Sequence, residues 1–235
     1  MDNSELDDIL TAVREFVREK VVPLETQVED EDAFPEGIIK ESAEMGLFGW
    51  ALPEEYGGLG LNAEQDALLA MELGYTTPAF RSLFGTNNGI AGQVLVNYGT
   101  DEQKSEWLPR LASGEVVASF ALTESEAGSD PSGLRTKAER VGDDYVINGS
   151  KRFITNAEAS DVLMVFARTD PNATGSKGIS VLLVPTKSEG VTVGPHDHKM
   201  GQAGAWTSEI FFDDVRVPAA NLIGGEEEKG FYAAM

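Results

Sequence analysis

The chain changes its character within a single stretch, Thr100-Asp-Glu-Gln-Lys-Ser-Glu-Trp-Leu-Pro-Arg-Leu-Ala-Ser-Gly-Glu-Val-Val-Ala-Ser-Phe-Ala-Leu122. Thr100 and Gln103 have the spacing of a capping box, which predicts a helix that ends at Gly114. The run 116–122 is rich in β-forming residues and predicts a strand. This stretch therefore places a boundary near residue 115, with helices expected before it and strands after it.

Residues 1–115 are predicted to form an all-helical domain. Apolar residues recur there at intervals of three and four, typical of helices with one buried face. The first stripe, from Leu6 to Val21, is expected to end at Pro23, and the acidic run 29–32 is expected to be a solvated loop. Further helices are predicted from Pro35 to Gly46, Asn62 to Gly74, and Asn88 to Tyr98. The second of these is expected to open with a capping box of Asn62 and Gln65.

Residues 116–225 are predicted to form a middle β domain. A hairpin is expected at 137–147, where two β-forming runs flank a Gly-Asp-Asp turn. Short strand-like runs then follow at 152–155, 162–169, 178–184, 191–193 and 209–212. Because no helical pattern separates them, a barrel or sandwich is favoured over a parallel sheet with crossover helices. The predicted fold class is thus α+β and multidomain, and residues 226–235 begin another helix.

Composition excludes several classes of function. The chain has 40 acidic and 18 basic residues, a formal net charge of −22, which argues against binding nucleic acids or anionic membranes. It has no cysteine, which excludes disulfides, zinc–thiolate sites, iron–sulfur clusters and a thiol nucleophile. No metal site is predicted. The first residues resemble no signal peptide and no apolar run is long enough to span a membrane, so we expect a cytoplasmic protein.

Two segments are candidates for ligand binding. In Phe120–Asp130, a strand leads to a hydroxyl at Thr123 and to a Gly128-Ser129 turn where backbone can approach a phosphate or a ring. In Lys151–Asn156, alternation would place Phe153 and Thr155 on one face, where a planar ligand could stack while a hydroxyl bonds its edge. The same residues are also common in ordinary turns and strands, so residue chemistry alone leaves both interpretations open.

Several segments together, in this order and across almost the whole chain, resemble the acyl-CoA dehydrogenase family of flavoproteins. They are Leu52-Pro-Glu-Glu-Tyr-Gly-Gly-Leu-Gly60, Tyr98–Lys104 with Leu108-Pro109, Phe120–Asp130, Asn148–Asn156, Lys199-Met-Gly201 and Phe211–Pro218. The resemblance implies that FAD lies between the middle β domain and a C-terminal four-helix domain. This chain stops at Met235, before such a domain, and is expected to be a fragment that is inactive by itself.

The resemblance also implies roles for particular residues. Phe120, Leu122 and Thr123 would line the flavin, with Leu122 and Thr123 at its pyrimidine side. Gly128 and Ser129 would bind the pyrophosphate. Alternatively, Ser129 would bind the acyl-CoA chain. The other flavin edge would be covered by three consecutive residues, Phe153, Ile154 and Thr155. Phe153 stands where several relatives carry Trp, and it keeps the aromatic face.

The activity implied is FAD-dependent α,β-dehydrogenation of an acyl-CoA thioester in fatty acid metabolism, with electrons passed to an electron-transfer flavoprotein. A homo-oligomer, a dimer or tetramer, is expected. The catalytic base in the family is a glutamate of the C-terminal domain, so no residue here is assigned that role. Relatives often carry Arg and Ser where this chain has Ala203 and Ala205. Two alternatives stay open: an acyl-CoA oxidase or flavin monooxygenase on the same fold, and a non-catalytic flavin-binding or assembly subunit.

Overall fold

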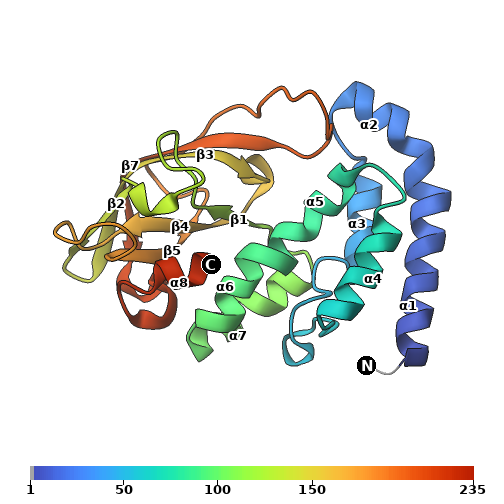
Figure 1. The fold of residues 1–235 in the computed structure, drawn as a ribbon, viewed down its shortest axis with the longest axis horizontal. Helices are drawn as coiled ribbons and strands as arrows, with labels where there is room; N and C mark the ends of the chain where they lie inside the picture. Colours follow the sequence, from blue (N-terminus) through green and yellow to red (C-terminus); the bar gives the residue numbers. More distant parts are fainter. Residues whose placement is uncertain (1–2) are drawn as a thin grey trace.

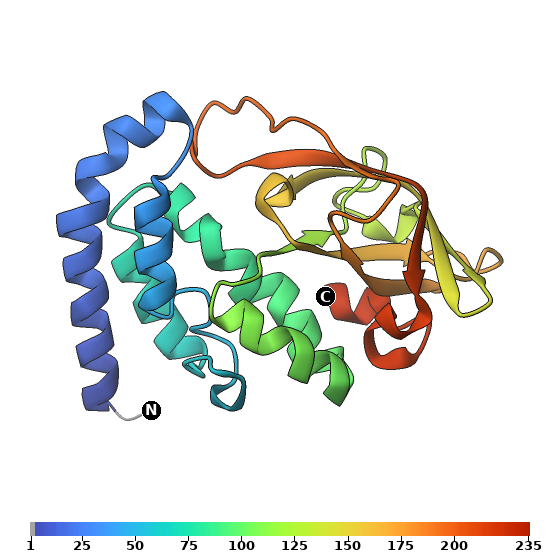
Figure 2. The same ribbon diagram turned by 180° about the vertical axis from the view of Figure 1, so that it is seen from behind.

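Helices occupy one end of the molecule and a seven-stranded sheet the other, in a computed structural model that describes residues 3–235 (Figure 1). The change from helices to strands falls where the sequence places it, because α7 ends at Ala112 and β1 begins at Ala118. The last residues return to the middle of the molecule, where α8 lies between the sheet and α6 (Figure 2).

The helical half begins with a long α1, and α7 leads into the sheet. The helices are α1 (Asn3–Phe16), α2 (Glu25–Glu31), α3 (Glu36–Glu44), α4 (Ala63–Leu73), α5 (Pro78–Gly85), α6 (Ala91–Tyr98), α7 (Asp101–Ala112) and α8 (Gly230–Ala234). Both predicted capping boxes are present: Asn62 with Gln65 opens α4, and Thr100 with Gln103 opens α7. No helix among residues 3–235 is long and apolar enough to cross a membrane.

Pro23 does not end the first helical run, contrary to the sequence prediction. After α1 the chain continues through a π-helical turn, Val17–Val21, and a 3₁₀ turn, Val22–Leu24, into α2. Pro23 lies in the first turn of the 3₁₀ segment, where its missing N–H is not needed. The predicted acidic loop at 29–32 is therefore helical as far as Glu31.

Besides α2, the helix α5 was not predicted, and α6 begins later than predicted. Thr77 caps α5 through a hydrogen bond from the Ala79 N–H to its hydroxyl oxygen, and Pro78 occupies the first helical position. A π-helical turn at Thr86–Ile90 follows, so the helix predicted from Asn88 begins at Ala91. The Asn87 and Asn88 side chains of this turn are buried and bond the backbone of other segments, so tertiary contacts explain the irregularity.

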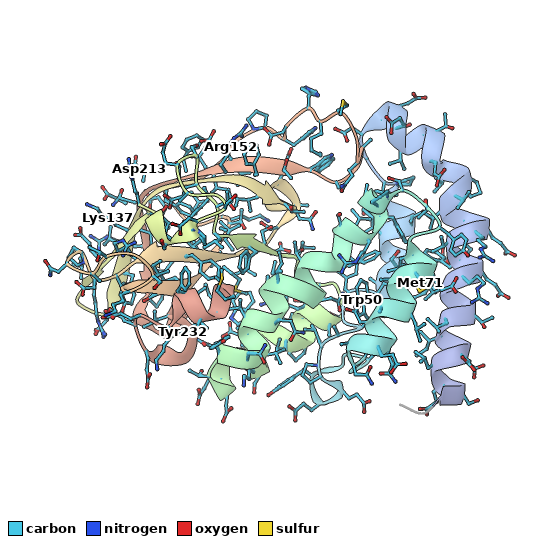
Figure 3. All side chains as sticks on the ribbon, in the orientation of Figure 1. Trp50, Met71, Lys137, Arg152, Asp213 and Tyr232 are labelled. Carbon is cyan, nitrogen blue, oxygen red and sulfur yellow. The ribbon has the colours of Figure 1, made fainter. Side chains whose placement is uncertain are left out.

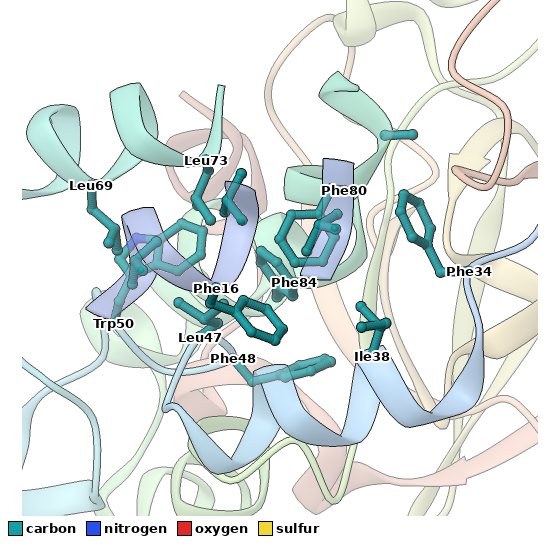
Figure 4. Close-up of a cluster of buried hydrophobic side chains, with 14 of the residues drawn as sticks. Phe16, Phe34, Ile38, Leu47, Phe48, Trp50, Leu69, Leu73, Phe80 and Phe84 are labelled. Carbon is teal, nitrogen blue, oxygen red and sulfur yellow. The ribbon is translucent and has the colours of Figure 1, made fainter. Parts of the chain in front are cut away.

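Aromatic rings form the core of the helical half. The Phe80 ring lies 5.1 Å from Phe84, 5.6 Å from Phe34 and 6.2 Å from Phe16, measured between centroids (Figure 4). Trp50 packs edge-on against Phe84 from the loop after α3. These rings hold α1, α5 and the loops on either side of α3 together.

The sheet is one curled layer, a half-barrel, in agreement with the predicted barrel-like middle domain. Its strands are β1 (Ala118–Ala121), β2 (Lys137–Val141), β3 (Asp144–Thr155), β4 (Val162–Arg168), β5 (Ile179–Pro185), β6 (Val191–Val193) and β7 (Thr207–Pro218). Their order is β1-β4-β2-β3-β7-β6, with β5 paired to β4. The predicted strand at 152–155 is the end of the long β3, which pairs antiparallel with β7.

A buried asparagine joins the two halves at the predicted boundary. Asn87 accepts a hydrogen bond from the Ala118 N–H at 2.8 Å and donates to the carbonyls of Leu111 and Val116. It thereby fixes the end of α7 and the start of β1 to the turn before α6. The domain limits themselves, at 115 and 225, stay predictions.

Candidate functional site

The two candidate segments, far apart in the sequence, lie side by side in the structure. The Ser119 hydroxyl donates to the Thr155 carbonyl at 2.8 Å, and the Arg152 N–H donates to the Thr123 carbonyl at 2.8 Å. Figure 3 shows where Arg152, the residue before Phe153, lies on the sheet. The end of β3 and the chain that leaves β1 therefore form one continuous surface.

A bulge near the end of β3 presents Phe153 to solvent. The pairing with β7 jumps from Lys151↔Ile210 to Ile154↔Ser208, so the simple alternation that the sequence suggested is interrupted. Phe153 has φ +58° and its side chain is 60% exposed, while Ile154 is 2% exposed. An aromatic residue in this backbone region and at this exposure is strained and poorly buried, a combination that is typical of functional sites.

Asn156 fixes the end of this bulged segment. Its backbone is also left-handed, with φ +61°, and its side-chain amide donates to the Ser82 and Leu83 carbonyls and to the Thr86 hydroxyl. These acceptors lie in and just after α5, in the helical half. The segment that carries Phe153 and Thr155 is thus held by side-chain bonds to the other half of the molecule.

Two hydroxyls at the two joined segments have no partner among the described residues, and a glycine turn further along the chain is open. The hydroxyls of Thr123 and Thr155 form no hydrogen bond with any other group of residues 3–235, and both residues are partly exposed. Gly128 has open space where a Cβ would lie, and Ser129 next to it is exposed. An exposed aromatic face, two free hydroxyls and an open glycine turn fit a large planar cofactor that carries a phosphate group.

A buried ion pair supports this surface from beneath, and residue patterns alone did not reveal it. The Lys151 ammonium lies 2.8 Å from Glu124 Oε1 and also donates to the Leu122 carbonyl at 3.1 Å. Glu124 accepts further hydrogen bonds from the Arg135 and Thr136 N–H groups and from the Thr136 hydroxyl. The sequence signal for this pair was limited to a lysine in the strand-like segment 151–156 and a glutamate just after the β-forming run 116–122.

Burial disfavours the charged forms of Lys151 and Glu124, and each of the two groups favours the charged form of the other. Burial lowers the pKa of Lys151 to about 8, although Glu124 acts in the opposite direction. Burial alone would raise the pKa of Glu124, but Lys151, the Thr136 hydroxyl and the Arg135 N–H together hold that pKa below its usual value. The hydrogen bond from the Lys151 ammonium to the Leu122 carbonyl joins the two candidate segments. The ion pair therefore positions the Leu122 backbone.

A hollow of about 250 Å³ opens beside Phe120, between α6 and α8. It is lined by Ile90, Val94 and Tyr98 on the side of α6 and by Tyr232 on α8. The Tyr98 hydroxyl donates to the Tyr232 carbonyl at 3.0 Å, which ties the two helices together. The hollow and the bulge thus adjoin opposite ends of one short segment, Phe120–Thr123.

The structure brings most of the predicted residues together. Hydrogen bonds join the segment of Phe120, Leu122 and Thr123 to the segment of Phe153, Ile154 and Thr155. Ile154 is packed in the sheet core, so only its backbone is available to a ligand. Gly128 and Ser129 lie beyond a tight turn, closed by hydrogen bonds between Glu124 and Ala127, and are not bonded to the bulge. The binding role of each of these residues stays a prediction.

Comparison with known proteins identifies the family. The model of the acyl-CoA dehydrogenase N-terminal domain matches residues 3–115, and the model of the middle domain of the same family matches residues 119–215. The chain belongs to the acyl-CoA dehydrogenase family, of which it carries the N-terminal and middle domains.

Individual relatives agree with this assignment. An acyl-CoA dehydrogenase of Bacillus subtilis is 39% identical over 95% of this chain and 58% of its own length. The crystal structure of a glutaryl-CoA dehydrogenase from Mycobacterium smegmatis in complex with FADH2 matches with a TM-score of 0.88 and 36% identity, over 98% of this chain and 58% of that one. A structure from work on the electron transferring flavoprotein of Acidaminococcus fermentans matches with a TM-score of 0.92 and 34% identity, over 100% of this chain and 62% of that one. The chain therefore spans a little over half the length of these relatives.

Proposed function

We propose that this chain forms the FAD-binding part of an enzyme that removes hydrogen from the α and β carbons of an acyl-CoA thioester. The observation that carries the proposal is the junction of the two candidate segments, where Phe153 is exposed on a bulge beside the free hydroxyls of Thr123 and Thr155. Bound FAD supplies the two-electron acceptor for such a reaction.

Three residues of the junction have complementary tasks in this proposal. The Phe153 ring offers an aromatic face against which the flavin ring can stack. Thr155 and Thr123 offer hydroxyls that can bond the polar edges of the flavin, since neither hydroxyl has a partner within residues 3–235. Stacking and hydrogen bonding together fix the plane and the rotation of the ring.

The remaining predicted residues serve the charged parts of the ligands. Gly128 leaves room for a phosphate to approach the backbone, and the Ser129 hydroxyl can donate to it or to the acyl-CoA chain. The hollow beside Phe120 is the candidate position for the acyl group because it lies next to the proposed flavin surface. The base that removes the α proton is not assigned to any residue of this chain.

We further propose an electron-transfer flavoprotein as the electron acceptor, which the match to the Acidaminococcus structure supports. With a net charge of −22, the protein would attract a positively charged docking surface. Charges separated by more than about 8 Å are screened at physiological ionic strength. Electron transfer is therefore expected to slow as salt is added, and rates unaffected by salt would contradict such steering.

Anaerobic titration of the complete enzyme, of which this chain forms the FAD-binding part, with acyl-CoAs of different chain length tests the function. The expected result is loss of the oxidised flavin absorbance with one class of chain length. A flavin that stays oxidised with every thioester would overturn dehydrogenation and leave the non-catalytic alternative. Rapid consumption of oxygen by the reduced flavin would instead identify an oxidase or a monooxygenase.

A further inference from the structure

The loop between β6 and β7, residues 194–206, leaves the sheet and reaches the helical half at the end of α2 (Figures 1 and 2). Asp32, the residue directly after α2, bonds this loop. The Gly204 N–H donates to Asp32 Oδ1 at 2.6 Å, and the Trp206 indole N–H donates to the Asp32 carbonyl at 2.6 Å. One residue of the helical half thus bonds the loop through its side chain and its backbone.

The fit of the loop against α2 is close. A Cβ on Gly204 would lie 2.8 Å from the Phe34 ring, and Gly204 has φ +84°, so a larger residue is excluded for two reasons. The His196 ring stacks on Trp206 with centroids 4.9 Å apart and an angle of 8° between the planes. His196 Nδ1 lies 2.8 Å from Glu158 Oε2, and Nε2 lies 3.4 Å from Asp32 Oδ2. The indole is therefore fixed by a hydrogen bond at its edge and by a ring on its face.

Trp206 connects this contact to the candidate flavin surface. The Asn156 N–H donates to the Trp206 carbonyl at 2.9 Å. Asn156 directly follows Thr155, and its side chain is bonded to α5 and the turn after it. A continuous set of hydrogen bonds thus runs from Asp32 through Trp206 to the end of the bulge that presents Phe153.

We propose that Asp32 and Trp206 are positioning residues for the flavin: they hold the Phe153–Thr155 bulge in its binding conformation through the Asn156 amide. The inference rests on the proposed function, which places the flavin at this bulge. A left-handed residue at each end of the segment, Phe153 and Asn156, needs external bonds to keep this conformation. The loop is held to the helical half through the Gly204 N–H, the Trp206 indole and the His196 ring.

The test is the variant Trp206→Phe, which removes the indole N–H and keeps an aromatic ring beside His196. Hydrogen exchange of the Asn156 amide is measured in the purified protein freed of flavin, and the dissociation constant for FAD is measured separately. We expect exchange to be about fivefold faster, the effect of one lost hydrogen bond, and FAD to bind about three- to tenfold more weakly.

Three further variants separate positioning from general stability. Asp32→Asn keeps an oxygen that accepts from Gly204 and tolerates φ +50°, so it should behave as the unaltered protein, whereas Asp32→Ala should behave as Trp206→Phe. Gln103→Leu is the matched control, because Gln103 donates to the Ala220 and Leu222 carbonyls across the same two halves, away from the bulge. It should lower stability and leave Asn156 exchange and FAD affinity unchanged.

Unchanged exchange at Asn156 in Trp206→Phe would overturn the proposal, whatever happens to FAD affinity. An equal loss of FAD affinity in Gln103→Leu would overturn it as well, since the effect would then be one of stability. Faster exchange with unchanged FAD affinity would also overturn the positioning role. If Phe153→Ala left FAD affinity unchanged too, the placement of the flavin at this bulge would fail with it; if that variant weakened binding, only the positioning inference would fail.

Discussion

The protein uses phenylalanine in two opposite ways in its two halves. Phe80 is fully buried among other aromatic rings and holds the helices together. Phe153 is 60% exposed, has a left-handed backbone, and contacts the Arg152 guanidinium, whose carbon lies 4.6 Å from the ring centroid. The first arrangement lowers the free energy of the fold, whereas the second keeps an apolar face in water. This contrast supports the proposal that the Phe153 ring binds a ligand, since nothing in the fold requires it to be exposed.

Removal of the buried ring should have the largest effect on stability. Phe80→Ala is expected to lower the free energy of unfolding by about 3–5 kcal/mol, because it leaves a cavity among closely packed rings. Urea unfolding followed by circular dichroism measures this change. FAD affinity at low temperature, where the variant stays folded, should be nearly unchanged. A loss below about 1 kcal/mol would show that the aromatic cluster is not the main core.

Breaking the ion pair beneath the site should have a comparable effect on stability. Lys151→Met leaves Glu124 buried without its partner and is expected to cost about 3–5 kcal/mol in urea unfolding. The double variant Lys151→Met/Glu124→Gln should recover most of this loss, since neither buried charge remains. Equal stability of the single and double variants would contradict the idea that an uncompensated charge causes the loss.

Removal of the exposed ring should reverse the pattern seen for Phe80. Phe153→Ala is expected to change the unfolding free energy by about 0.5 kcal/mol or less, because the ring is mostly solvated. FAD affinity should fall about tenfold through the lost stacking. Equilibrium titration of the flavin-free protein, followed by flavin fluorescence, measures the affinity. Phe153→Trp provides the control, and its affinity should be at least that of the original protein.

The free hydroxyl at the bulge should contribute less than the ring. Thr155→Val keeps the shape of the side chain and removes its hydroxyl, so FAD affinity should fall about fivefold, the effect of one hydrogen bond. Stability should be unchanged because the hydroxyl has no partner in residues 3–235. Ser119→Ala gives the contrast. It removes the donor to the Thr155 carbonyl and should lower stability as well.

Low pH should have the smallest and most gradual effect, because it weakens the ion pair of Lys151 and Glu124 that supports the site. The folded-state pKa of Glu124 lies below the usual 4.5, so its stabilising contribution is present above pH 4.5 and is lost as pH falls through the folded-state value. Urea unfolding midpoints should therefore decline below pH 4.5. Glu124→Gln should show a shallower decline than the original protein. Equal slopes for both proteins would assign the acid sensitivity to other carboxyl groups.

Local sequence signals were sufficient where the structure depends on neighbouring residues. The capping boxes at Asn62 and Thr100 and the hairpin of β2 and β3 were predicted correctly because each is made of groups a few residues apart. Signals failed where distant packing decides the outcome. Pro23 is accommodated within a continuing helical run, and the π-helical turn before α6 depends on buried asparagine side chains that bond other segments.

The sequence by itself determined the types of element, the boundary near residue 115, the family resemblance and the two segments that carry the candidate site. Tertiary structure decided how those segments meet. The bulge at Phe153, the pair of Lys151 with Glu124, and the contact of Trp206 with Asp32 across 174 residues all join groups that no local pattern relates. The physical reason is that hydrogen bonds and burial act between groups close in space, whereas propensity and periodicity report only on neighbours along the chain.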